Sequence, residues 1–155
     1  MEKLETLLME LESKIPKMEL INTSISSSPV GWHIDHILLT INQITNALMR
    51  SNPDNFKRQF KVARLFVFTM NKIPRGRAQV PQIVRPKNEI DIAAIEKHLV
   101  SSKEKLMVLK ELNPGNYFEH PFFGNLKLKP AVKFLVIHTK HHLEIIYDII
   151  KAENI

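Results

Sequence analysis

Apolar residues recur along almost the whole chain at spacings of three and four, and this pattern constrains the fold more than any other feature. Such spacing puts the apolar side chains on one face of an α-helix, because the helix turns once every 3.6 residues. Only four glycines occur among 155 residues, too few for a chain of tight hairpins. We therefore predict an all-α fold that forms one domain over residues 1–155.

The pattern divides into five predicted helices, which favour a four-helix bundle with a short additional helix and two long loops. Ser28 is a candidate cap for the second helix, and Pro29 suits its first position, where no amide donor is needed. Long loops inside a compact domain are often functional. The predicted helices cover residues 2–14, 29–50, 55–71, 89–112 and 130–152, and the loops cover 73–88 and 114–129.

Each predicted helix has an apolar stripe that should face the core. The stripe of the first helix is four leucines, at positions 4, 7, 8 and 11. The third and fourth helices have stripes of the same kind. Their predicted inward residues are Phe56, Phe60, Ala63, Phe66, Val67 and Met70, and Ile92, Ile95, Leu99, Leu106 and Leu109.

The composition narrows the kinds of site that the chain can build. It has no cysteine, so any metal site must use nitrogen and oxygen ligands. Its first residues are charged and amphipathic, and no apolar run is long enough to cross a bilayer. We expect a cytoplasmic protein with no membrane partner. The formal net charge of +6 favours anionic partners.

Histidines cluster on two of the predicted helices. The last helix carries His138, His141 and His142 in the sequence HTKHHL. His138 and His142 are four residues apart, so they stand one turn apart on the same face and can bind one metal ion together. The second helix carries His33 and His36, and either could supply a third ligand from a facing helix.

These motifs resemble the DinB-like (YfiT-like) superfamily, whose members are four-helix bundles with a three-histidine metal site. The resemblance rests on GWHIDH in the second helix, on HTKHHL in the last, and on the loop EHPFFGNLKLKP, which is similar to the HPxFG-type loop of an uncharacterised branch. It covers nearly the whole chain in helix order and length. The family takes one ligand from the second helix and two from an HxxxH on the last, which implies His36, His138 and His142 here.

The start of the second helix departs from the family pattern. Many members have a Trp-Ser/Thr-x-x-Glu start, with a histidine eight residues after the tryptophan. Here His36 follows Trp32 by only four residues, and position 40 is Thr40. If positions are counted from the expected helix cap at Ser28 instead, His36 lies as far into the helix as the ligand histidine of the family does. His33 still stays a rival for the third ligand.

Three neutral imidazoles leave at least one coordination position open, which is typical of catalytic rather than structural sites. Imidazole suits several divalent ions, with zinc or nickel favoured here. The resemblance implies a metal-dependent enzyme, either a thiol S-transferase that uses a low-molecular-weight thiol or a hydrolase. It further implies a homodimer, because relatives often pair, and the positive charge of the chain favours a small, anionic substrate.

Other polar residues have candidate roles near this site. His141 is a candidate catalytic proton donor beside the histidine pair. Asp35 could accept a hydrogen bond from a ligand imidazole, but a solvent-facing position is expected because it is turned about 100° from its neighbour. His120 is expected to be a plain loop residue, His98 an incidental one, and Tyr147 a tyrosine at the bundle boundary.

A basic segment, residues 57–87, lies between the predicted site elements and contains no acidic residue. Arg75 and Arg77 lie in the proline-rich loop and are candidates for binding anionic groups of a cofactor or substrate. Two alternatives to an enzyme stay open: a non-catalytic helical bundle, and an anion- or nucleic-acid-binding protein that uses this segment. Nucleic acid is the weaker choice, because no recognised binding motif is present. The basic residues are Lys57, Arg58, Lys61, Arg64, Lys72, Arg75, Arg77, Arg85 and Lys87.

Overall fold

The computed structural model describes residues 1–76, 81–86 and 91–153. Within these ranges the chain is mostly helical, with a small two-stranded antiparallel sheet. Short 3-10 helices lie between the longer elements, and the one called η3 (Gln82–Val84) borders the site described below. The main elements are α1 (Glu2–Glu12), α2 (Val30–Arg50), α3 (Val62–Met70), α4 (Ile92–Glu111), β1 (Tyr117–His120), β2 (Gly124–Lys127) and α5 (Leu128–Glu153).

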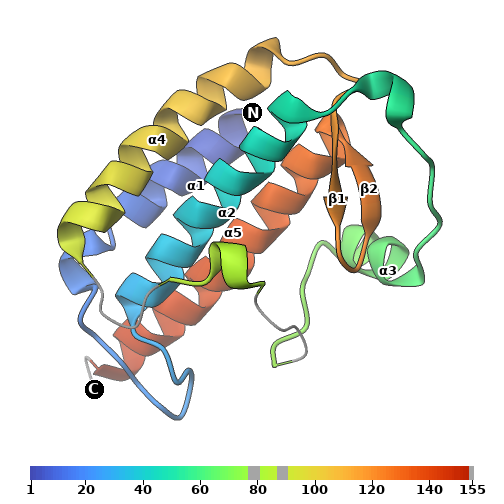
Figure 1. Ribbon diagram of the computed structural model, residues 1–155. Coiled ribbons are helices and arrows are strands. Elements are labelled where there is room, and N and C mark those ends of the chain that lie inside the picture. The colour runs from blue at the N-terminus through green and yellow to red at the C-terminus, as the bar shows by residue number, and fades with distance from the viewer. Residues whose placement is uncertain (77–80, 87–90, 154–155) are drawn as a thin grey trace.

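Four helices, α1, α2, α4 and α5, lie side by side and enclose the core (Figure 1). Helix α2 contacts α4 and α5, and α1 contacts the same two helices. The apolar stripes read from the sequence meet between them, because burying these stripes removes the most apolar surface from water. The four leucines of α1 are all buried as predicted. Fully buried large residues include Leu8, Ile34, Leu38, Ile41, Ile95, Leu135 and Ile146.

The start of α2 differs slightly from the prediction. The helix begins at Val30 with Pro29 as its cap, and no side chain caps it, so Ser28 does not have the predicted role. The preceding segment supplies the partners instead. The Val30 N–H donates to the carbonyl of Leu20, and the next N–H donates to Met18. These bonds satisfy amides of the first turn that have no partner inside the helix.

Helix α3 is shorter and more exposed than the prediction for residues 55–71. Only Val67 of its predicted inward residues is buried, whereas Phe60, Phe66 and Met70 have more than half of their surface exposed. Figure 1 shows why, since α3 lies beside the β-hairpin at the edge of the molecule rather than among the four long helices. Periodicity identifies an amphipathic helix but not the element that covers it.

The predicted loop over residues 114–129 contains the hairpin formed by β1 and β2, so the all-α prediction missed this element. Gly124 has a φ of +68°, a conformation that glycine adopts without strain and that other residues rarely adopt. A Cβ atom there would collide with the side chain of Gln59. The hairpin packs against α2 and α5 and so brings β1 to the same end of the core as the histidines.

Helix α4 agrees with its predicted stripe except at its first residue. Ile92 is half exposed, whereas Ile95, Leu99, Leu106 and Leu109 are buried. The Asp91 side chain caps the helix by accepting a hydrogen bond from the Ala93 N–H at 2.9 Å. Among the described residues, no helix is both long enough and apolar enough to cross a membrane.

Candidate metal centre

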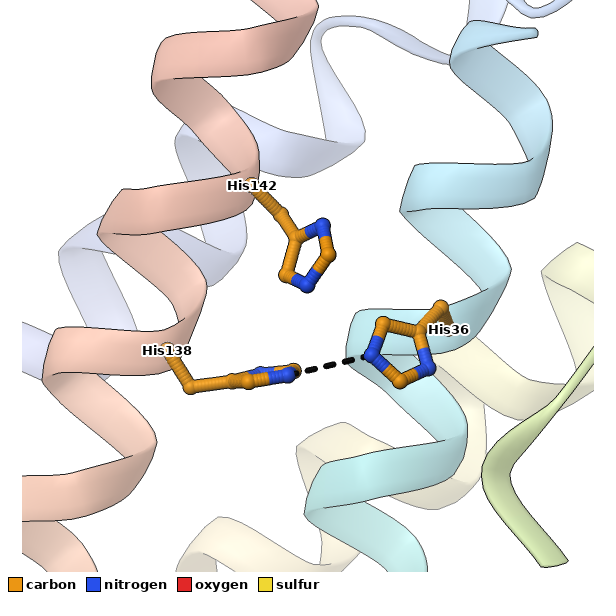
Figure 2. Close-up of side chains that lie close together, drawn as sticks. All are labelled: His36, His138 and His142. Carbon is orange, nitrogen blue, oxygen red and sulfur yellow. Dashed lines mark hydrogen bonds between the residues drawn. The ribbon is translucent and has the colours of Figure 1, made fainter. Parts of the chain in front are cut away.

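Three histidines from two helices converge between α2 and α5 (Figure 2). His36 comes from α2, and His138 and His142 come from α5. One nitrogen from each ring lies within 4.8 Å of the other two, and the Nε2 atoms of His36 and His138 are 3.1 Å apart. Two nitrogen ligands about 2.05 Å from a tetrahedral ion lie about 3.3 Å apart. The three rings could therefore hold one ion after small side-chain movements.

The surrounding side chains keep the three rings buried. His36, His138 and His142 are each less than a tenth exposed. The Trp32 ring stacks on the His36 ring with a centroid distance of 5.1 Å and an interplanar angle of 23°. Phe134, one turn before His138 on α5, packs against the His138 ring with a centroid distance of 5.5 Å. Polar rings in such a setting require specific partners, since burying an unbonded polar group is costly.

The backbone of η3 supplies the partner of His36. Nδ1 of His36 lies 2.7 Å from the carbonyl oxygen of Val84, so Nδ1–H donates to it. This bond places the proton on Nδ1 and leaves the Nε2 lone pair facing the other two rings. Histidines that bind metals commonly donate their second ring N–H to a backbone carbonyl or carboxylate in this way.

His33 supports His142 in a similar way and is not one of the three clustered rings. Nδ1 of His33 lies 3.0 Å from Nδ1 of His142, and Nε2 of His33 lies 3.0 Å from the Ser26 hydroxyl. When His142 donates Nδ1–H to His33, its Nε2 lone pair is free to face His36 and His138. Both nitrogens of His33 are then engaged, which makes it a hydrogen-bonding partner rather than the third ligand.

Burial keeps these imidazoles neutral. It lowers the pKa of His33 to about 4 and is the main cause of a lowered pKa at His36. The pKa values of His138 and His142 are well below the usual value, first because of burial and then because neighbouring histidines repel a second positive charge. A neutral imidazole is the form that binds a metal ion.

One atom of the cluster has no partner. Nδ1 of His138 is buried without a hydrogen bond to any described residue. When His138 offers Nε2 to the cluster, its proton is on Nδ1, and this buried N–H has no acceptor among the described residues, unlike the Nδ1 atoms of His36 and His142. Three neutral nitrogen donors with free lone pairs match the preference of zinc and nickel.

The histidine cluster opens into a cavity of about 500 Å³. Its described walls are α2 from His36 onward, residues 73–76, Pro81 with η3, the β1 strand with the turn that follows it, and α5. His120 and His141 both line it. His120 is therefore not the plain loop residue that the sequence suggested, because the hairpin carries it to the cavity. The position of His141 agrees with a role beside the cluster.

Asp35 and His98 do not have the roles expected of them. Asp35 is buried rather than exposed to solvent, and its carboxylate bonds to Nδ1 of His98 at 2.6 Å. The His98 carbonyl also accepts a hydrogen bond from the Asn42 amide. These contacts join α2 to α4, so His98 is a structural partner of α2 rather than an incidental residue. Tyr147 lies at the boundary with α1, as expected, and donates to Glu10.

The basic segment lies mostly on the surface. The Arg75 guanidinium pairs with Asp148 of α5 at 2.8 Å, close enough to His33 and His141 to lower their pKa values. Arg64 donates to the carbonyls of Gln59 and Asn125 and so ties α3 to the hairpin. Arg77 and Lys87 lie outside the described residues. A role for Arg75 and Arg77 in binding anions stays a prediction.

Sequence reasoning missed the partners that orient the rings. The carbonyl of Val84 has no sequence signature, because any residue offers one. The contact between His33 and His142 depends on how two helices are rotated against each other. Three residues did have a signal, since Trp32 and His33 lie in GWHIDH and His120 lies in EHPFFG, and the resemblance rests on both motifs.

A family described as "Protein of unknown function (DUF1569)" matches residues 1–148. The chain belongs to this family. No curated protein and no solved structure matches it. The DUF1569 match spans α1 to most of α5 and therefore includes both helices that carry the histidine cluster.

Proposed function

We propose that this DUF1569 protein is a metal-dependent enzyme, of the thiol S-transferase or hydrolase type, with one divalent ion bound by His36, His138 and His142. Zinc and nickel are the favoured ions. The observation that carries the proposal is the convergence of three buried, neutral imidazoles at the floor of a cavity. The helix order and the ligand positions support a DinB-like four-helix bundle as the fold.

Each residue around the cluster has a defined task in this proposal. Val84 and His33 accept the Nδ1 protons of His36 and His142 and thereby aim the Nε2 lone pairs at one point. Trp32 and Phe134 hold two of the rings in place and exclude water. Such partners commonly change metal affinity by 10- to 100-fold when they are removed.

An open coordination position is what makes the site catalytic in this proposal. Three protein ligands leave room for a water, a thiol or a substrate oxygen. A divalent ion held there supplies Lewis-acid chemistry and lowers the pKa of the water or thiol that reaches it. His141 lines the same cavity and is the candidate that moves a proton to or from the reacting group.

The experiment that separates the two reaction types uses the protein loaded with Co²⁺, whose absorption spectrum reports its ligands. A low-molecular-weight thiol that enters the open position is expected to add a sulfur-to-cobalt charge-transfer band. If thiols leave the spectrum unchanged but acetohydroxamate alters it, the hydrolase type is supported and the transferase type is not. If neither compound alters it, or if Co²⁺ does not bind, the proposed enzyme has no accessible metal and the proposal fails.

A further inference from the structure

We infer that the cavity over the histidine cluster takes a small, mainly apolar substrate whose single polar oxygen group lies between the cluster and the His120 imidazole. This inference rests on the proposed metal site, because the cluster would bind the polar group. It narrows the substrate class, since it disfavours substrates that carry many polar groups.

The cavity walls are largely apolar. A volume of about 500 Å³ lies within the usual range for small-molecule sites. Buried apolar residues from three separate elements line it, namely Ile44 of α2, Phe123 after β1, and Phe134 of α5. The charged lining residues, Arg50 and Glu119, are exposed and so lie toward solvent. Thr40, Gln43 and Asn46 also line the cavity, so a substrate with many hydroxyl groups would lose its water and find only these few polar partners beside the histidines.

Large apolar side chains that line the cavity are also left uncovered. Phe122 is 51% exposed and Ile83 is 67% exposed, although both line the cavity. They come from opposite sides, one from the turn after β1 and the other from η3. An apolar ligand that reached between them would cover surface that now contacts water, and this burial favours binding.

His120 supplies a hydrogen-bond donor to a mainly apolar wall, on which Thr40, Gln43 and Asn46 are further polar residues. Its Nδ1 accepts hydrogen bonds from the backbone N–H groups of Phe122 and Phe123, at 3.1 and 3.3 Å. These bonds fix the proton on Nε2, and the described residues provide no acceptor for it. The ring is held by stacking on Phe123 and by an edge contact with Phe134. A fixed N–H near the histidine cluster would bind an oxygen acceptor of the substrate.

The test compares three hydroxamates that share one metal-binding group, using calorimetry on the protein loaded with Zn²⁺. Acetohydroxamate has almost no tail, octanohydroxamate has an apolar tail, and gluconohydroxamate has a polar tail. We expect octanohydroxamate to bind at least about tenfold more tightly than the other two, since each buried methylene adds to affinity. Equal affinities would overturn the inference.

Substitutions of the exposed wall residues separate the contribution of the ligand's tail to affinity from that of its polar group. Phe122→Ser and Ile83→Ser should weaken octanohydroxamate by about threefold to tenfold each and leave acetohydroxamate unchanged. Met107→Ser is the matched control, because Met107 is 61% exposed on α4 but does not line the cavity. An equal loss of affinity for octanohydroxamate in Met107→Ser would show that Phe122 and Ile83 do not bind the ligand's tail.

His120 should act on the shared polar group instead. His120→Ala is expected to weaken all three hydroxamates by about threefold to tenfold, and His120→Gln, which keeps an N–H donor, should restore most of the affinity. Unchanged binding by His120→Ala would overturn this role. Failure of the metal proposal looks different, because then no Zn²⁺ is retained and even acetohydroxamate does not bind.

Discussion

At the residue scale, His33 shows how the same side chain type can have two different roles within one cluster. It is as buried as the three clustered rings, and its sequence position made it a rival ligand. The structure directs both of its nitrogens elsewhere, one to His142 and one to Ser26. A hydrogen-bonding partner changes how well a metal site binds, whereas a ligand decides whether it binds.

Replacing His33 tests this difference. We expect His33→Ala to bind the same number of Zn²⁺ ions per chain as the unaltered protein but with an affinity about 10- to 100-fold lower, because His142 loses its acceptor. Competition with a chromophoric chelator measures this affinity. His120→Asn is the control that should leave it unchanged. Loss of the ion altogether would instead make His33 a ligand.

At the scale of elements, the long helices were predictable and their surroundings were not. The stripes of α1 and α2 follow the helical period closely, and burial of one face decides their position. The hairpin was missed because its strands are only four residues long and carry little alternation. The orientation of α3 depends on what covers it, which no local pattern encodes.

The same reasoning applies to the site. The i, i+4 spacing on α5 places His138 and His142 together without any tertiary information. Choosing between His33 and His36 required the rotation of α2 against α5, and the cavity required the hairpin. The sequence therefore predicts that the ligands are histidines and that His138 and His142 act as a pair, whereas helix packing decides which histidine is the third ligand.

Helix α2 offers a direct test of the predicted core face. Leu38→Ala should lower the free energy of unfolding by about 2–5 kcal/mol, because Leu38 is fully buried and its removal leaves a cavity. Met49→Ala on the same helix should change it by less than about 0.5 kcal/mol, since Met49 is 49% exposed. Urea denaturation measures both. Similar losses for the two variants would contradict the packing described here.

Gly124 tests the hairpin. Gly124→Ala should destabilise the protein by about 1–2 kcal/mol or more, because alanine is strained at a φ of +68° and its Cβ would meet Gln59. Gly76→Ala separates the two causes, since Gly76 has a φ of +73° and an added Cβ would have no atom of the described residues within 4 Å. The Gly124 variant should therefore lose more stability than the Gly76 variant in urea denaturation. A smaller loss would argue against the close contact at the hairpin.

At the scale of the whole molecule, the buried histidines link stability to pH. The pKa values of His33 and His120 are lowered to about 4 in the folded protein, from an unfolded value of 6.5. The unfolded chain therefore binds more protons between these pH values, so stability is complete above pH 6.5 and is lost as the pH falls toward 4. Each histidine contributes about 1.5 kcal/mol of loss between pH 6.5 and 5.

Urea denaturation of metal-free protein at pH 7 and pH 5 measures this dependence. We expect a lower midpoint at pH 5, and a smaller difference in the double variant with His33→Asn and His120→Asn. A midpoint that stays the same, or rises as the pH falls, would show that these imidazoles are not buried in neutral form. The double variant keeps every carboxylate of the protein. If its midpoint depends on pH as strongly as that of the unaltered protein, the carboxylates rather than these two histidines account for the dependence.

The central claim is that His36, His138 and His142 together hold one divalent ion, and elemental analysis tests it most directly. Protein purified without chelator or metal-affinity resin, then given Zn²⁺ and dialysed, should contain about one ion per chain. Single replacement of any of the three histidines by alanine should leave less than about a tenth of that amount in a folded protein, whereas His120→Ala should retain it. Unaltered protein without metal, or a His138→Ala variant with a full complement, would contradict the account.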